Sequence, residues 1–195
     1  MNIEIKGLTK SYGSEPLFKD LSINFNDTGL YIIKGDSGVG KTTLLRIIAG
    51  IDKKYTGYVT PLSKGDVSFA FQEYHLFDTL NAINNVRIGA RDTASFLKAR
   101  AILSELNFTR GEMYLYPNEL SGGMKQRVSV ARALLHSGSV ALLDEPTKEL
   151  DPGNVQRVLD LIRRESQKRL VIIVTHKEED FETLSDIASV IEIKK

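Results

Sequence analysis

One segment of the sequence has the residue types and spacing of a phosphate-binding loop. Residues 35–42 read Gly-Asp-Ser-Gly-Val-Gly-Lys-Thr and fit the pattern G-x-x-x-x-G-K-[ST] at every fixed position. Glycines there would let backbone N–H groups turn towards phosphate oxygens, and the helix that follows would add the positive end of its dipole. Lys41 is placed to reach the β- and γ-phosphates of a nucleotide, and Thr42 to ligate Mg²⁺. The alternative is an ordinary glycine-rich turn between a strand and a helix.

A pair of carboxylates, Asp144 and Glu145, directly follows the apolar run Val140–Leu143. Ligands of open α/β sheets bind at the carboxyl ends of the strands. In that position Asp144 would organise Mg²⁺, and Glu145 would act as a base or positioner for an attacking water. Taken alone, the pattern indicates no more than two strand-end acids that face solvent. Its combination with the loop at residues 35–42 favours the catalytic interpretation.

The elements that must position these residues are strands alternating with helices. Leu30–Ile33, Val140–Leu143 and Leu170–Val174 are short apolar runs typical of strands buried on both faces, and Val190–Ile193 predicts a last short strand. Helical spacing and capping residues predict helices over four segments: Lys41–Ala49, Asp92–Leu106, Lys125–Leu135 and a segment opening at Asp151–Pro152. The alternation implies an α/β fold with a mainly parallel core sheet.

Two further regions complete the outline. The alternation of Ile3 and Ile5, and later of Leu21, Ile23 and Phe25, predicts antiparallel strands with one buried face at the N-terminus. The polar segment Asn107–Asn118 reads as a loop. A length of 195 residues without a repeat or linker favours a single domain over residues 1–195.

Composition excludes several classes of protein. Basic and acidic residues number 26 and 25, so the chain lacks the basic excess of a general nucleic-acid binder, and we expect no nucleic-acid partner. The absence of cysteine rules out disulfides and thiolate metal sites. Charged residues interrupt the N-terminal segment, and nowhere do 18 apolar residues run together, so we expect neither a signal peptide nor a membrane span.

A third motif lies at residues 120–127, which read Leu-Ser-Gly-Gly-Met-Lys-Gln-Arg. Physically it is a glycine-rich turn that runs into a helix, a second N-terminus able to attract an anion. Ordinary capping of that helix by Ser121 is the alternative. These residues resemble the signature motif of the ABC ATPases. Together with the loop at 35–42 and the carboxylates at 144–145, the resemblance covers essentially the whole chain in the family's order.

The resemblance implies a P-loop NTPase with an N-terminal antiparallel β subdomain and an inserted helical subdomain over approximately residues 74–120. It implies ATP and Mg²⁺ as cofactors and an ATP-driven dimer of two such subunits, here a homodimer with two competent sites. Residues from the loop would bind the nucleotide, namely Gly35, Asp36, Ser37, Gly38, Val39, Gly40, Lys41, Thr42 and Thr43. Ser121, Gly122 and Gly123 of the partner subunit's copy would close over the γ-phosphate.

Other site residues are implied by position. Tyr12 resembles the aromatic residue that stacks on adenine, although a lone tyrosine is usually just partly buried. Gln72 resembles the glutamine that contacts Mg²⁺ and the attacking water, and His176 the switch histidine that contacts the γ-phosphate; either could instead be a satisfied polar residue at a strand end. Asp151 resembles the aspartate that touches the opposite subunit, and it could equally cap the helix at Pro152. Catalysis would thus rest on Glu145, His176 and Gln72, and the metal on Thr42, Gln72 and Asp144.

The family's role is to power a membrane transporter, so we expect transmembrane permease subunits as partners and a cytoplasmic protein held at the inner face of the cell membrane. The motifs look most like those of nitrate, sulfonate and taurine importers, with lipoprotein-release and macrolide-export cassettes as the nearest rivals. We expect no additional C-terminal regulatory domain. Lys148 and Glu149 depart from the small or apolar residues that the family usually has there. A soluble single-cassette ATPase, such as one for iron–sulfur assembly, and a P-loop module without turnover are the alternatives.

Overall fold

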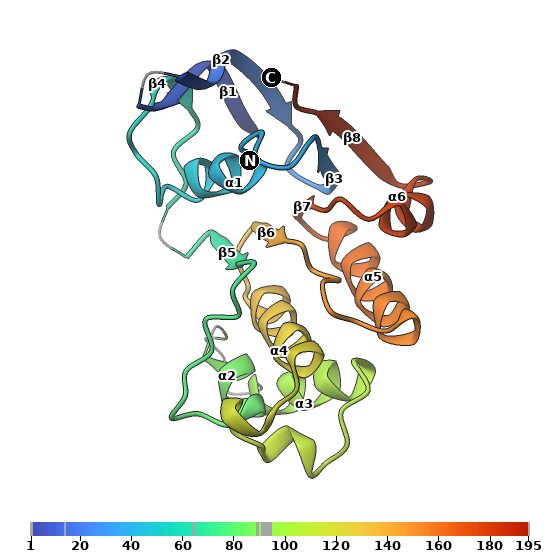
Figure 1. Cartoon of the computed structure of the whole chain (residues 1–195). Coiled ribbons are helices and arrows are strands. Elements are labelled where there is room, and N and C mark those ends of the chain that lie inside the picture. The colour runs from blue at the N-terminus through green and yellow to red at the C-terminus, as the bar shows by residue number, and fades with distance from the viewer. Residues whose placement is uncertain (1, 14, 64, 89, 91–94, 195) are drawn as a thin grey trace.

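A sheet of five strands forms the centre of the fold (Figure 1). The computed structural model describes residues 2–13, 15–63, 65–88, 90 and 95–194. The strand order is β5-β6-β7-β3-β8, and each neighbouring pair is parallel, which confirms the predicted α/β class. The strands are β3 (Gly29–Lys34), β5 (Val67–Ala70), β6 (Val140–Asp144), β7 (Leu170–Val174) and β8 (Ala188–Glu192).

Both faces of the central strands are covered, as the continuous apolar runs predict. In β6, Val140 and Leu142 pack in one buried cluster, whereas Ala141 and Leu143 pack in the other. Because side chains alternate along a strand, the two clusters lie on opposite faces of the sheet. Asp144 is the last residue of this fully buried strand, so its carboxylate is buried as well.

An antiparallel sheet of three strands forms the N-terminal part, in the order β2-β1-β4. Its strands are β1 (Ile3–Tyr12), β2 (Glu15–Phe25) and β4 (Thr56–Val59). Ile3 pairs with Phe25, so the predicted apolar faces of β1 and β2 meet. Helix α1 (Lys41–Ile48) follows the loop and shares one buried cluster with both sheets. Strand β4 was not predicted, because three of its four residues are exposed and carry no alternation.

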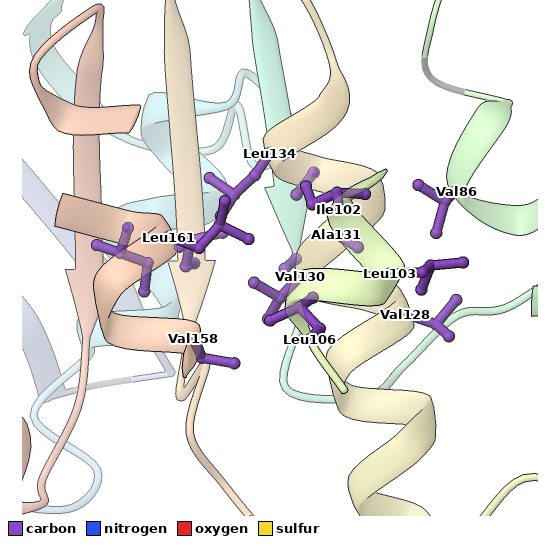
Figure 2. Packing of buried hydrophobic residues seen from close by; sticks show 14 of the residues in the cluster. Val86, Ile102, Leu103, Leu106, Val128, Val130, Ala131, Leu134, Val158 and Leu161 are labelled. Carbon is purple, nitrogen blue, oxygen red and sulfur yellow. The ribbon is translucent and has the colours of Figure 1, made fainter. Parts of the chain in front are cut away.

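The helical part lies at the end of the molecule away from β1 and β2 (Figure 1). It contains α2 (Ala82–Arg87), α3 (Ser95–Glu105) and the 3₁₀ turns Glu112–Tyr114 and Pro117–Glu119. Figure 2 shows its packing, where Val86 and Leu103 approach Val128 of helix α4 (Gly122–Leu135). The predicted helix 92–106 matches α3, with 92–94 outside the described residues. The two 3₁₀ turns and the six-residue α2 escaped prediction because each is too short to show a helical period.

Helix α4 begins at Gly122 rather than at Lys125, which corrects the predicted boundary. The two glycines favour a turn by propensity, but the Ser121 side chain accepts a hydrogen bond from the Met124 N–H at 3.3 Å and caps the helix earlier. Helix α5 (Pro152–Ser166) buries Val155, Val158, Leu159 and Ile162, as its spacing predicts. Helix α6 (Glu178–Leu184) was not predicted. Among the described residues, none of the helices has the length and apolar character to cross a membrane.

Candidate functional site

The carboxyl ends of four parallel strands bring the candidate residues to one edge of the central sheet. The loop follows β3, Gln72 follows β5, Asp144 ends β6 and His176 follows β7. A cleft of about 350 Å³ opens at this edge. It is lined by Tyr12, Leu17, Ser37, Gly38, Gly40, Lys41, Thr42, Thr43, Gln72, Glu145 and Val174. Residues from four separate motifs therefore share one cleft, as expected at the strand ends of an open α/β sheet.

The loop owes its shape to glycines at positions where a side chain does not fit. A Cβ on Gly35 would lie 2.5 Å from the carbonyl oxygen of Ile193, and Gly40 has a φ of +104°. Other residue types rarely adopt a φ in that region. The Val39 side chain is 3% exposed and packs in the buried cluster shared with α1, which anchors the loop from the side of the core. The loop can thus present backbone N–H groups to an anion.

Lys41 supplies the cation of this loop. Its Nζ donates to the carbonyl oxygens of Gly35 and Asp36 at 2.7 and 2.9 Å. These partners are carbonyl dipoles rather than carboxylates, so they do not neutralise the ammonium charge. The charge stays available for a phosphate group in the adjoining cleft.

Asp144 is a buried carboxylate at the base of the site, with 1% of its surface exposed. Its Oδ2 is buried without a hydrogen-bond partner among the described residues. Burial raises the pKa of Asp144, while the Thr42 hydroxyl and the charge of Arg46 act in the opposite direction. An unpartnered carboxylate oxygen beside a hydroxyl is a donor set suited to a hard divalent cation such as Mg²⁺.

A metal at this place would need ligands from outside the protein. Within the described stretches there is no group of three or more His, Cys, Asp or Glu side chains that could hold a metal ion. Magnesium sites with one or two protein ligands complete their shell with water and substrate phosphates. The residues present therefore fit Mg²⁺ bound together with a nucleotide, and they do not fit an independent metal site.

Glu145 and His176 come together although they lie on different strands. The Glu145 Oε1 is 3.2 Å from the His176 Nδ1. The Glu145 side chain is 19% exposed and faces the cleft, whereas His176 is 65% exposed and lies outside the cleft lining. Glu145 has a φ of +51°, a left-handed conformation that is strained for a non-glycine residue. Backbone strain of this kind is typical of functional positions.

Asp180 connects the loops that carry these two residues. It is fully buried, and its Oδ2 accepts hydrogen bonds from the hydroxyls of Thr147 at 2.7 Å and Thr175 at 2.6 Å. Thr147 follows Glu145 by two residues, and Thr175 precedes His176. Sequence analysis missed Asp180, because the neighbouring acids are exposed and burial alone distinguishes it from them.

Tyr12 lies at the end of β1 and is 61% exposed. The Lys10 Nζ lies 4.7 Å from the centre of the Tyr12 ring, and the Tyr12 hydroxyl donates to Asp52 at 3.2 Å. Lys10 and Asp52 also form an ion pair at 2.7 Å, and the hydrogen bond from Lys10 is the main reason why the pKa of Asp52 is lowered. The ring is thus held in place while much of its surface stays open to a planar partner such as a base.

Ser121, Gly122 and Gly123 do not line the cleft of their own chain. A Cβ on Gly122 would lie 2.3 Å from the Glu149 carboxylate, which also accepts a hydrogen bond from the Tyr74 hydroxyl at 2.6 Å. Burial and then Glu149 raise the pKa of Tyr74 to about 12. The unusual Glu149 thus places a negative charge beside the motif at 120–127.

Asp151 is exposed and caps helix α5. Its carboxylate accepts a hydrogen bond from the Asn154 N–H at 3.1 Å, and the Asn154 side chain donates to it at 2.6 Å. These hydrogen bonds from Asn154 lower the pKa of Asp151. The capping alternative is therefore present in the single chain, and exposure leaves one side of the carboxylate accessible.

Comparison with known proteins identifies relatives of the same architecture. The family model described as ABC transporter matches residues 18–148. The spermidine/putrescine import ATP-binding protein PotA of Legionella pneumophila (strain Paris) is 34% identical, over 94% of this chain and 55% of its own length. The macrolide export ATP-binding/permease protein MacB 1 of Yersinia pestis bv. Antiqua (strain Antiqua) is 35% identical, over 98% of this chain and 33% of its own length. The chain thus spans about half the length of the import relative and about a third of the length of the export relative.

Solved structures agree with this result. A dimeric ATP-binding cassette in a post-hydrolysis state, bound to ADP and phosphate, superposes with a TM-score of 0.84 at 28% identity, covering 98% of this chain and 94% of the other. A dimeric bacterial ABC transporter cassette superposes with a TM-score of 0.83 at 27% identity, covering 99% and 97%. The five-stranded sheet, the N-terminal sheet and the helical insert described above are the parts of that cassette fold.

Proposed function

The chain belongs to the ABC transporter family, and on that premise we propose that it binds and hydrolyses ATP as one half of a nucleotide-driven dimer. The observation that carries this proposal is the shared cleft, where Tyr12, the loop, Gln72 and Glu145 meet. Tyr12 is suited to stacking on adenine, the loop to binding the phosphates and Glu145 to activating the reacting water. The bound ADP and phosphate of the structural relative lend support to the same chemistry.

In this mechanism the protein binds and orients rather than forming covalent bonds. Lys41 and the loop N–H groups stabilise charge on the β- and γ-phosphates. Glu145 accepts a proton from the attacking water, and His176, 3.2 Å from the Glu145 carboxylate, contacts the γ-phosphate. Thr42, Gln72 and Asp144 would hold Mg²⁺, which neutralises phosphate charge when it is bound.

The position of residues 121–123 supports a composite site shared by two subunits. These residues do not line the cleft of their own chain, yet they lie at the start of a helix whose N-terminus can attract an anion. We propose that they close over the γ-phosphate held by the partner, with Asp151 at the contact between subunits. A homodimer then has two complete sites, and both structural relatives are dimers.

The dimer would drive membrane-spanning permease subunits, with the helical subdomain at residues 74–120 receiving them at the inner face of the cell membrane. Import and export relatives match at similar identity, so the direction of transport rests on the motif resemblance, and we propose import of the nitrate, sulfonate or taurine type. Affinity purification from detergent-solubilised membranes should recover a polytopic protein that stimulates the ATPase. Purification of the chain without such a protein favours a soluble ATPase instead.

The most direct test of nucleotide binding is Lys41→Ala. Removing the cation from the loop should weaken ATP binding about 10- to 100-fold, because hydrogen bonds to charged groups contribute more than neutral ones. Titration calorimetry measures the affinity. Lys53→Ala, which removes an exposed lysine outside the cleft, is the matched control and should bind ATP normally. Wild-type affinity in folded Lys41→Ala protein argues against this assignment of the loop.

Asp144→Asn should affect stability and metal binding in opposite directions. The raised pKa of Asp144 means that its charged form destabilises the nucleotide-free protein, and that this cost appears as pH rises through the raised value. At neutral pH the neutral asparagine should therefore raise the melting temperature, while stabilisation by Mg²⁺ with ATP should be lost. In the wild type, Mg²⁺ binding should weaken as the pH falls, because only the ionised carboxylate is a ligand. Since the pKa of Asp144 is raised, this weakening should begin at a higher pH than for an aspartate of pKa 3.8.

Thermal melts with and without Mg²⁺ and ATP measure both effects of Asp144→Asn. Asp160→Asn changes an exposed aspartate of helix α5 and is the control, for which neither quantity should change much. If Asp144→Asn retains full stabilisation by Mg²⁺ with ATP, Asp144 is not a metal ligand.

A further inference from the structure

Gln126 is a buried polar residue on the helix that starts at the signature motif. It lies five residues after Ser121 in α4 and is 0% exposed. Its Nε2 donates a hydrogen bond to the backbone carbonyl oxygen of Glu145 at 2.9 Å. The side chain thus links α4 to the residue proposed as the base, although 19 positions separate the two in sequence.

The Glu145 peptide has a strained conformation and takes part in three hydrogen bonds. Its N–H donates to the Val174 carbonyl at 2.8 Å, which extends the pairing of β6 with β7. Its carbonyl accepts from Gln126 and from the Lys148 N–H at 3.1 Å. A residue held at a φ of +51° keeps that conformation only while its surroundings constrain it. Of these two donors, Lys148 lies three residues further along the same turn, whereas Gln126 comes from helix α4.

Packing alone does not account for an amide at this position. The Gln126 Oε1 is buried and has no hydrogen-bond partner among the described residues. An unsatisfied buried acceptor lowers stability, and an apolar side chain of similar size would avoid that cost. The amide donor to Glu145 is the contact that distinguishes glutamine from such a side chain.

We propose that Gln126 is a positioning residue for hydrolysis, which holds the Glu145 backbone so that its carboxylate faces the cleft. This inference rests on the proposed function, because it assigns Gln126 a role through the base. Since Ser121 caps the helix that carries Gln126, the orientation of Glu145 also follows the position of the segment that meets the partner's nucleotide. Each subunit's base is thereby linked to closure of the opposite site.

The test compares Gln126→Met, Glu145→Gln and the double variant. Methionine matches glutamine in length but has no donor, so the Gln126→Met variant should show a kcat about 10- to 100-fold lower, as expected for a misplaced catalytic group. Its KM for ATP and its ATP affinity should stay within about twofold of wild type, because the loop is untouched. In the Glu145→Gln background the same change should cause no further loss of residual hydrolysis, since Gln126 acts through Glu145.

Gln156→Met, which alters an exposed glutamine of α5, is the control and should leave all parameters unchanged. If Gln126→Met does not fold by circular dichroism, Gln126→Leu replaces it, because leucine also lacks the donor, is apolar at a buried position and favours a helix. Wild-type kcat in the folded variant overturns the inference, as does an equal loss in both backgrounds. A Glu145→Gln protein that hydrolyses ATP normally contradicts the proposed function instead.

Discussion

Glu145→Gln should bind ATP like the wild type and hydrolyse it at least about 100-fold more slowly. Glutamine keeps the size and the backbone contacts of this position but cannot take a proton from water. The loop, Lys41 and Tyr12 are unchanged, so nucleotide affinity should persist. Single-turnover hydrolysis together with calorimetric titration separates the two effects.

The same variant should accumulate as an ATP-bound dimer, because in the proposed cycle ATP closes the dimer and hydrolysis reopens it. Size exclusion with light scattering should show a doubling of mass on addition of ATP with Mg²⁺, and no doubling with ADP. Glu182→Gln, an exposed glutamate of α6, is the control and should hydrolyse ATP at the wild-type rate. Normal hydrolysis by Glu145→Gln would show that the base lies elsewhere.

A mixture of Ser121→Arg and Lys41→Ala subunits should hydrolyse ATP although each parent is inactive. Ser121 is exposed at the start of α4 and lies outside the cleft of its own chain. Ser121→Arg should therefore leave nucleotide binding by the single subunit nearly intact and prevent closure, since a bulky cation fills the space for the partner's γ-phosphate. In a mixed dimer one site carries both defects and the other carries neither.

Hydrolysis by the mixture should depend on the ratio of the two variants and should be greatest near equal amounts. Wild-type activity should show positive cooperativity in ATP, with a rate per subunit that rises with protein concentration. Each parent incubated alone under the same conditions is the control. An inactive mixture despite demonstrated subunit exchange, with wild-type activity linear in protein, excludes the composite site.

Local elements were predictable because their signals are local. The apolar runs predict β6 and β7 to within one residue, since a strand buried on both faces needs no polar alternation. The loop at 35–42 is recognisable because its backbone has positive φ at Gly35, Gly38 and Gly40, where other residue types are rarely found. This requirement leaves a fixed spacing of glycines before the helix. Helix α4 was placed too late, because Gly122 and Gly123 have low helix propensity and the cap by Ser121 outweighs it.

The candidate site itself was predictable only as a set of separate motifs. Their meeting depends on the strand order β5-β6-β7-β3-β8, which is not the order along the chain. Resemblance to the ABC ATPases implied that Gln72, Glu145 and His176 act together. The 3.2 Å approach of Glu145 to His176 is a property of the folded sheet, because adjacent parallel strands end at the same edge.

By itself the sequence determined the parallel α/β class, since this follows from apolar runs alternating with helical spacing, and it predicted the phosphate loop and the candidate site residues from motif spacing and family resemblance. Only the tertiary structure decided which buried polar groups support them. Asp180 accepts hydrogen bonds from the loops that carry Glu145 and His176, and Gln126 donates one to the Glu145 carbonyl. The Tyr74 hydroxyl donates one to Glu149 beside Gly122. These contacts join residues distant in sequence, and a hydrogen bond of that kind has no spacing to detect. Asp180 and Gln126 are buried, and a polar group in the core needs such a partner, whereas the Tyr74–Glu149 hydrogen bond lies at the surface.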